Sequence, residues 1–154
     1  MIKLYDLTAT WFYSGYLKPA SGTWGTLAAL PLCFGVAIIC GIWGLILGSM
    51  ILFCIGLWAS HQYEIKTGEH DSSRVVIDEA AGMMLASIPI VYYVQYWWMV
   101  AICFGAFRLF DAVKIGPVGW LDNNIHGALG VMLDDIAAGL MAAVVIMGVM
   151  QWII

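Results

Sequence analysis

Three long stretches of the chain carry no formal charge, and this feature limits the possible folds more than any other. The stretches run from Pro19 to Ser60, from Ala80 to Phe107 and from Ile136 to Ile154. A helix needs about 20 apolar residues to cross the hydrocarbon core of a bilayer. The first stretch is therefore long enough for two such helices, the second for a short pair, and the third for one.

Composition agrees with a membrane protein. Of the 154 residues, 63% are hydrophobic and only 10% are charged, whereas a soluble domain has about 25% charged residues. We therefore predict an all-α fold, a polytopic membrane helical bundle that forms a single domain over residues 1–154. It should contain about four to five membrane-embedded helices, spanning roughly residues 24–40, 42–60, 79–94, 97–111 and 131–153.

The segment before the first apolar stretch is rich in aromatic residues. Trp11, Phe12, Tyr13 and Tyr16 are expected at the level of the lipid headgroups, so the N-terminal segment is predicted to be interfacial. The net charge of -4 argues against nucleic acid as a partner.

The charges predict how the bundle is oriented. In the five-helix arrangement, the uncharged turns near Gly41 and Gln95 and the C-terminus share one side of the membrane. All six lysines and arginines, and all ten acidic residues, fall on the other side or at its border. The positive-inside rule makes that side cytoplasmic, so we expect the active chemistry there.

Two acidic pairs stand at the start of apolar runs. Asp78-Glu79 and Asp134-Asp135 are each followed within a few positions by Ala-Ala-Gly. Small residues let helices approach closely in lipid, so the two helix starts can bring their carboxylates around a shared cation. Carboxylate ligands favour Mg²⁺ over Zn²⁺, since the cysteines lie inside the apolar runs.

Two further polar segments can bind an anion. Ser21, Gly22 and Thr23 offer hydroxyls and backbone N–H groups just before an expected helix, although a Ser/Thr cap with a glycine turn has the same pattern. Arg108, Asp111 and Lys114 recur every three residues; they can bind a phosphate, or form an ordinary ion pair with snorkelling side chains. Taken together, the carboxylates and cations indicate metal-assisted phosphoryl transfer.

Two other classes of protein would place carboxylates in a membrane. A small cation transporter is the main alternative, but it needs no Arg108 or Lys114 beside the acids. A phospholipid synthase would show a longer array of Asp, Gly and Arg on two consecutive helical turns, which this sequence lacks.

Three blocks of the sequence resemble the signatures of the phosphatidylglycerophosphatase A family. The blocks are SGTWGTLAALP, HDSSRVVIDEAAGMM and FRLFDAVKIGPVGWLDNNIHGALGVMLDDIAAGL, in the family's order from about Ser21 to Leu140. The chain departs from the family pattern at Ser21, where a proline is usual, and at Ile115, which follows the lysine in place of proline.

The resemblance implies an enzyme of phospholipid biosynthesis in the bacterial inner membrane. It implies Mg²⁺-dependent hydrolysis of phosphatidylglycerophosphate to phosphatidylglycerol and inorganic phosphate, with membrane lipids as surroundings. Transferred residue by residue, the family's signatures fall on Asp78 and Glu79, on Arg108, Asp111 and Lys114, and on Asp134 and Asp135. Our hypothesis takes the two acidic pairs as metal and catalytic residues and Arg108 and Lys114, with Ser21, Gly22 and Thr23, as phosphate ligands. Asp111 is a further catalytic ligand or the residue that orients Arg108.

Two points stay open within this interpretation. The attacking water can be activated by the metal, by His70 or by Asp71. A homodimer is also compatible with the small-residue spacing from Gly44 to Gly48.

Overall fold

The structure is a computed structural model that describes residues 3–69 and 72–153. Every secondary-structure element assigned in those ranges is a helix, as predicted. The elements are α1 (Leu4–Ala9), the 3₁₀ helix η1 (Ser14–Tyr16), α2 (Ser21–Thr67), α3 (Ile77–Ala86), α4 (Ile88–Tyr92), α5 (Met99–Val113), α6 (Pro117–Asn124) and α7 (Ala128–Ile153).

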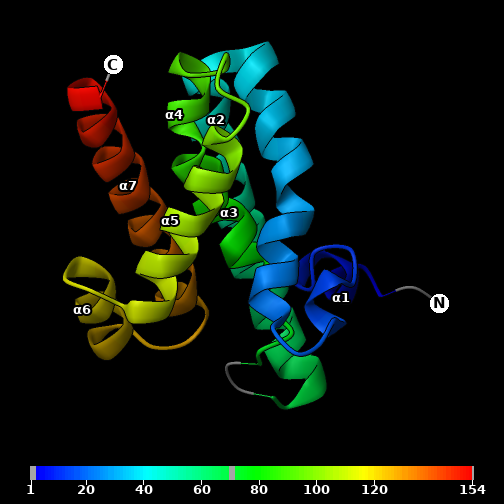
Figure 1. The fold of residues 1–154 in the computed structure, drawn as a ribbon. Helices are drawn as coiled ribbons and strands as arrows, with labels where there is room; N and C mark the ends of the chain where they lie inside the picture. The colour runs from blue at the N-terminus through cyan, green and yellow to red at the C-terminus, as the bar shows by residue number, and fades with distance from the viewer. Residues whose placement is uncertain (1–2, 70–71, 154) are drawn as a thin grey trace.

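The long helix α2 is interrupted at Gly41. The backbone there has φ 62° and ψ -153°, a conformation that is essentially restricted to glycine. A Cβ built on Gly44 would lie 2.2 Å from the Cβ of Cys40, so the chain reverses with almost no loop. Both ends of α2 consequently lie toward the bottom of Figure 1 while the middle of this helix lies at the top, and the break at Gly41 confirms the predicted turn.

The predicted helix over residues 79–94 is wrong in one respect, because the chain forms two short helices there. α3 ends at Ala86 and α4 begins at Ile88. Pro89 has no N–H to donate to the carbonyl of Leu85, so the helix cannot continue regularly through this point. Ser87, between the helices, donates its Oγ hydroxyl to the carbonyl of Met83 at 2.8 Å.

The remaining helices complete the bundle. α5 and α7 correspond to the predictions for 97–111 and 131–153, whereas α6 was not predicted. Gly116 and Pro117 end one helix, as expected, but Pro117 also begins α6, since proline suits the first turn of a helix. The turn at Gly41, the α4–α5 connection and the C-terminus all lie at one end of the molecule (Figure 1).

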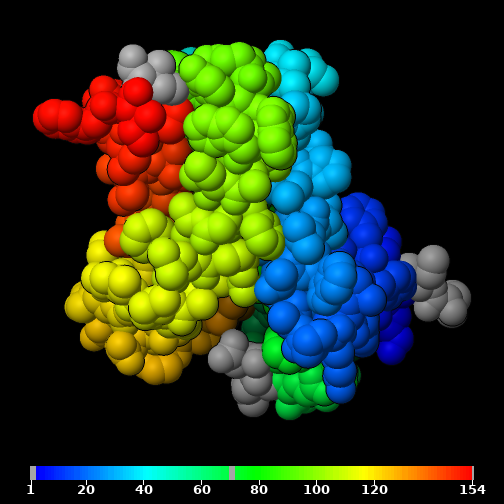
Figure 2. Space-filling view, viewed as in Figure 1, coloured from blue at the N-terminus to red at the C-terminus, as the bar shows by residue number. Residues whose placement is uncertain are grey.

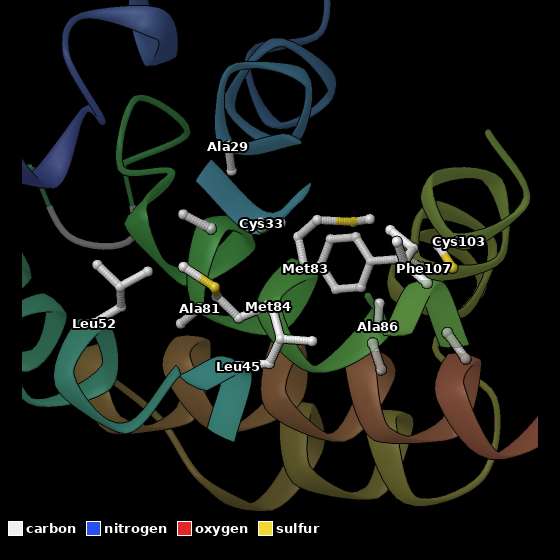
Figure 3. Close-up of a cluster of buried hydrophobic side chains, with 14 of the residues drawn as sticks. Ala29, Cys33, Leu45, Leu52, Ala81, Met83, Met84, Ala86, Cys103 and Phe107 are labelled. Carbon is white, nitrogen blue, oxygen red and sulfur yellow. The ribbon is translucent and has the colours of Figure 1, made fainter. Parts of the chain in front are cut away.

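Helix α3 forms the centre of the core. All its residues except Glu79 are buried. Figure 3 shows Ala81, Met83, Met84 and Ala86 of this helix surrounded by side chains of α2 and α5, among them Leu45 and Phe107. Because α3 is packed tightly in the core, the backbone of its first turn, which carries Asp78 and Glu79, is held in a fixed position.

The outer surface of the bundle is apolar. Two described helices, α2 and α7, are long and apolar enough to cross a membrane, and most of their apolar windows is not buried inside the protein. In Figure 2 α5 lies across the front of the molecule between α7 and the first half of α2. Large exposed apolar side chains on α2 and α7 include Phe34, Ile39, Trp43, Leu47, Ile51, Val144, Val149 and Trp152.

The N-terminal segment packs against α2 and the chain before α3. The backbone N–H of Val76 donates to the carbonyl of Ala9 at 2.9 Å. Phe12, Tyr13 and Tyr16 are exposed, but Trp11 is only 7% exposed and belongs to the core. The interfacial position of this segment stays a prediction.

Candidate metal and phosphate site

Three carboxylates from two helices converge inside the bundle. Asp78 and Glu79 lie in the first turn of α3, and Asp135 lies in the second turn of α7. One oxygen atom from each lies within 4.8 Å of the others, which is close enough for all three to bind one metal ion. The predicted meeting of the two acidic pairs therefore involves three of their four residues.

Close contact between glycines brings these carboxylates together. A Cβ built on Gly139 would lie 2.2 Å from the carbonyl oxygen of Gly82, and one on Gly82 would lie 2.5 Å from that of Asp135. Any larger side chain would force α3 and α7 apart. The small residues after each acidic pair thus let the main chains touch, as the sequence predicted.

The carboxylate cluster has the properties expected of a cation site. Asp78 Oδ1 and Glu79 Oε2 are buried and have no hydrogen-bond partner among the described residues. Burial away from water raises the pKa of the Asp78 carboxyl to about 7, and the charges of Asp134 and Asp111 act in the same direction. Buried, unpaired oxygen ligands fit Mg²⁺, which binds carboxylates and has little affinity for uncharged apolar surroundings.

Asp134 points to a different partner. Its Oδ2 accepts a hydrogen bond from the Lys114 ammonium at 3.1 Å, and its Oδ1 accepts from the backbone N–H of Asp135 at 3.0 Å. Lys114 also pairs with Asp122. Burial lowers the pKa of Lys114, but its hydrogen bonds to both aspartates outweigh this and raise the pKa, so the lysine stays charged.

Arg108 lies between the carboxylate cluster and a second acid. Its NH1 atom is 2.6 Å from Asp111 Oδ2 and 3.8 Å from Glu79 Oε1. The spacing of three residues places Arg108 and Asp111 on one face of α5, as predicted. The guanidinium is thereby held beside the cluster with donors that can face an anion.

The first turn of α2 forms the other wall. A Cβ on Gly22 would lie 2.2 Å from Glu79 Oε1 and 3.1 Å from Arg108 NH2, so a larger residue here would displace the ends of these two side chains. Ser21, Gly22 and Thr23 lie inside the first helical turn, not before the helix as expected. Their backbone N–H groups belong to the turn that has no intrahelical acceptors, where an anion is favoured.

A polar cavity of about 430 Å³ joins these parts. Asp78, Glu79 and Arg108 line one side of it. Ser21 and Gly22 line another, where the Ser21 hydroxyl donates to the carbonyl of Ser73 at 2.5 Å. The cavity is not lined by Asp111, Lys114, Asp134 or Asp135. Asp135 therefore belongs to the carboxylate cluster but lies behind the cavity wall.

Two further residues of this cavity were missed by the sequence analysis. Ser60 and Tyr63 of α2 line it, and the buried Ser60 hydroxyl has no hydrogen-bond partner among the described residues. With Glu64 they form a polar face at positions i, i+3 and i+4 near the end of an apolar helix. That spacing is the sequence pattern from which these two residues could have been predicted. The predicted catalytic residues His70 and Asp71 lie outside the described residues.

Comparison with known proteins identifies the family to which the sequence belongs. Residues 7–150 match the family model described as phosphatidylglycerophosphatase A. A phosphatidylglycerophosphatase A of Escherichia coli (strain K12) is 36% identical over 90% of this chain and 79% of its own length. The one from Haemophilus influenzae (strain ATCC 51907 / DSM 11121 / KW20 / Rd) is 31% identical over 96% of this chain and 90% of its own.

A third relative carries a different name. A protein of Bacteroides thetaiotaomicron, provisionally named a phosphatidylinositol-3-phosphatase, is 34% identical over 96% of this chain and 94% of its own. No solved structure shows a significant match. Because the family model covers nearly the whole chain and two relatives above 30% identity share its description, the chain belongs to the phosphatidylglycerophosphatase A family.

Proposed function

We propose that this protein is a Mg²⁺-dependent phosphatase that hydrolyses phosphatidylglycerophosphate to phosphatidylglycerol and inorganic phosphate at the cytoplasmic face of the bacterial inner membrane. The proposal rests on the convergence of Asp78, Glu79 and Asp135 beside the Arg108 guanidinium. This chain belongs to the phosphatidylglycerophosphatase A family, which agrees with that arrangement. Carboxylates alone would suit a cation site, whereas carboxylates with an adjacent cation suit a metal and a phosphate together.

The three clustered carboxylates would hold Mg²⁺. When bound, Mg²⁺ supplies positive charge that stabilises the oxygens of the phosphoryl group during its transfer. Asp134, also predicted to be a ligand, is hydrogen-bonded to Lys114. Metal ligation by Asp134 and phosphate binding by Lys114 stay predictions.

The substrate's terminal phosphate would lie between Arg108 and the first turn of α2. Arg108 donates to the phosphoryl oxygens, and Asp111 fixes the guanidinium from the other side. The backbone N–H groups of Ser21, Gly22 and Thr23 provide further donors. A water oxygen would then bond to phosphorus as the bond from phosphorus to the glycerol oxygen breaks, and the departing glycerol oxygen would take up a proton to become the hydroxyl of phosphatidylglycerol.

The attacking water must lose a proton. His70 and Asp71 are our candidates for accepting it, and a bound metal ion that favours its loss is the alternative.

Exposed apolar side chains support insertion in a membrane. A soluble helix of this hydropathy would be mostly buried, whereas the apolar windows of α2 and α7 are only 11% and 33% buried. Trp43, Trp97 and Trp152 are all more than 70% exposed near the uncharged end, where an outer belt of aromatic residues is expected. The uncharged end carries no lysine or arginine, so the opposite end would face the cytoplasm.

The direct test is phosphate release by the purified full-length protein in detergent micelles. The substrates are phosphatidylglycerophosphate, phosphatidic acid and phosphatidylinositol 3-phosphate, each with Mg²⁺ and with EDTA. We expect Mg²⁺-dependent release that is fastest from the first lipid. Fastest release from the inositol lipid would instead assign the function named for the Bacteroides relative. No release from any lipid by folded protein, with Mg²⁺ flux in liposomes, would favour the transporter.

A further inference from the structure

We propose that Ser60 of α2 recognises the free hydroxyl of the glycerol that carries the substrate's terminal phosphate. This inference rests on the proposed function. It makes Ser60 the residue that distinguishes phosphatidylglycerophosphate from lipids that lack this hydroxyl.

The Ser60 hydroxyl is buried and unpaired. The residue is 8% exposed, and its Oγ has no hydrogen-bond partner among the described residues. Two other hydroxyls of α2 donate to the carbonyl four residues earlier. Thr26 donates to Gly22 at 2.8 Å, and Thr67 donates to Tyr63 at 2.7 Å. Ser60 makes no such bond to its own helix. An unpaired buried hydroxyl costs stability, and a ligand in the adjoining cavity can supply the missing partner.

The packing of α2 directs Ser60 toward the start of α3. Gly56 precedes Ser60 by four residues and therefore shares its face of the helix. A Cβ built on Gly56 would lie 3.3 Å from Cγ2 of Ile77, the residue before Asp78. Ser60 lies one turn further along this face, and it lines the polar cavity together with Asp78 and Glu79. Ser60 is consequently part of a wall of the proposed active site.

The polar cavity can hold more than a phosphate group. Its volume of about 430 Å³ lies in the range of about 300 to 1,000 Å³ that is typical of small-molecule sites. Arg108 is the one cationic side chain among the described residues that line it, whereas Glu64, Glu69, Asp78 and Glu79 are acidic. A second anionic group, the phosphodiester of the lipid, would find no cationic partner there and would face carboxylates. The neutral glycerol between the two phosphates is the part of the substrate that suits the rest of the cavity.

Phosphatidylglycerophosphate carries a free hydroxyl close to the group that is cleaved. This hydroxyl is on the glycerol carbon next to the one esterified by the terminal phosphate, and a serine can donate a hydrogen bond to it or accept one from it. In phosphatidic acid the corresponding carbon carries an acyl ester instead. A site that hydrogen-bonds a substrate hydroxyl discriminates against analogues without it, because its own polar group is then left unpaired. Ser60 would therefore favour phosphatidylglycerophosphate over phosphatidic acid.

Removing the Ser60 hydroxyl should abolish the preference for a substrate hydroxyl. The test compares phosphatidylglycerophosphate with its deoxy analogue, in which a propanediol without the central hydroxyl replaces the headgroup glycerol. We expect wild-type protein to hydrolyse the natural lipid with a kcat/KM about tenfold higher, which equals ~1.4 kcal/mol. Ser60→Ala should lower kcat/KM for the natural lipid about tenfold and leave that for the analogue within about twofold of wild type.

Ser49→Ala is the matched control on the same helix. Ser49 is also buried, but its hydroxyl donates to the carbonyl of Ala81 at 2.9 Å, and it does not line the polar cavity. Its loss should lower the temperature of thermal unfolding and leave the ratio of the two kcat/KM values as in wild type. The same unfolding measurement verifies that the Ser60→Ala protein is folded.

The ratio between the two substrates decides the outcome. Equal losses on both substrates in Ser60→Ala would show that Ser60 binds water or supports the fold, and would overturn the proposal. A ratio near one in wild type, or an unchanged ratio in Ser60→Ala, would overturn it as well.

A binding measurement separates failure of this proposal from failure of the proposed function. Phosphonate analogues of the two lipids, in which a methylene group replaces the ester oxygen at the terminal phosphorus, are not hydrolysed. Calorimetric titration in detergent micelles with Mg²⁺ should show about tenfold tighter binding of the hydroxyl-bearing phosphonate by wild type, and equal binding of both by Ser60→Ala. This pattern without phosphate release from any lipid would refute the proposed function and support the hydroxyl site. Phosphate release from phosphatidylglycerophosphate, with equal binding of both phosphonates by wild type, would support the function and overturn the role of Ser60.

Discussion

At the scale of single residues, the two aspartates of one motif have different surroundings. Adjacent residues on a helix point about 100° apart, so Asp134 and Asp135 cannot both face α3. Asp135 joins Asp78 and Glu79, whereas Asp134 faces Lys114. The sequence predicted that the acidic residues would converge, but it could not show which of the two adjacent aspartates faces the cluster.

Removing a carboxylate of the cluster should abolish turnover. We expect Asp78→Asn and Asp135→Asn each to lower kcat by at least about 100-fold, because a neutral amide is a poor Mg²⁺ ligand. Asp6→Asn is the matched control, since Asp6 lies on α1 and accepts a hydrogen bond from Tyr16. Phosphate release with a Mg²⁺ titration measures the effect. A near-normal rate in either variant would remove that residue from the site.

A double-mutant cycle distinguishes the two roles open to Asp134. If Asp134 acts through its hydrogen bond to Lys114, Asp134→Asn and Lys114→Gln should each lower kcat/KM about tenfold, and together no more than the worse single change. Losses that multiply to about 100-fold would mean that the two side chains act independently, with Asp134 as a metal ligand. Steady-state kinetics of the four proteins provide the cycle.

At the scale of the elements, backbone contact between two helices fixes the site. Gly139→Ala should destabilise the protein by at least about 2 kcal/mol, because its Cβ would collide with the carbonyl oxygen of Gly82. The remaining folded protein should lose activity, since Asp135 would move away from Asp78. Thermal unfolding and phosphate release test both effects.

Gly148→Ala is the control for this substitution within the same helix. A Cβ there meets nothing within 4 Å, so stability should change by less than about 1 kcal/mol and activity should be unchanged. Equal effects of the two substitutions would show that helix α7 responds to any added methyl group and not to the contact with α3.

The reversal at Gly41 gives a second prediction about an element. Gly41→Ala should cost about 1 to 3 kcal/mol of stability, because an L-residue is strained at this φ and ψ. Gly35→Ala, in the preceding half of α2, should be neutral within about 1 kcal/mol, since its Cβ has open space. Thermal unfolding compares the two. Equal stability of both variants would contradict a strained turn.

The helix breaks were predictable to different degrees. The turn at Gly41 follows from length, because an uncharged stretch twice as long as a membrane span must fold back. The break between α3 and α4 was missed although Pro89 marks it, because proline is tolerated within membrane helices when neighbours satisfy the freed carbonyls. The contact between Gly22 and Glu79 could not be predicted from the sequence either, since it depends on how α2 packs on α3.

At the scale of the whole molecule, one end of the bundle carries no charged residue, because the turn within α2, the α4–α5 connection and the last turns of α7 all lie in uncharged stretches. In a chain without native cysteines, Ser72→Cys should react with a membrane-impermeant maleimide only after spheroplasts are permeabilised. Gln95→Cys, which is exposed at the opposite end, should react in intact spheroplasts. The reverse pattern would place the carboxylate site outside the cytoplasm and contradict the proposed orientation.

The main-chain contact between Gly82 and Gly139 also bears on which ion the proposed metal site would select. Two backbones in van der Waals contact cannot come closer, and the enclosed helix α3 has no room to withdraw. The backbones that carry the carboxylates of the two helices therefore stay at a nearly constant separation. Mg²⁺ binds oxygen at about 2.1 Å, whereas Ca²⁺ needs about 2.3 to 2.6 Å and more ligands. A rigid frame of this kind discriminates by ionic radius, so calcium should occupy it poorly even at millimolar concentration.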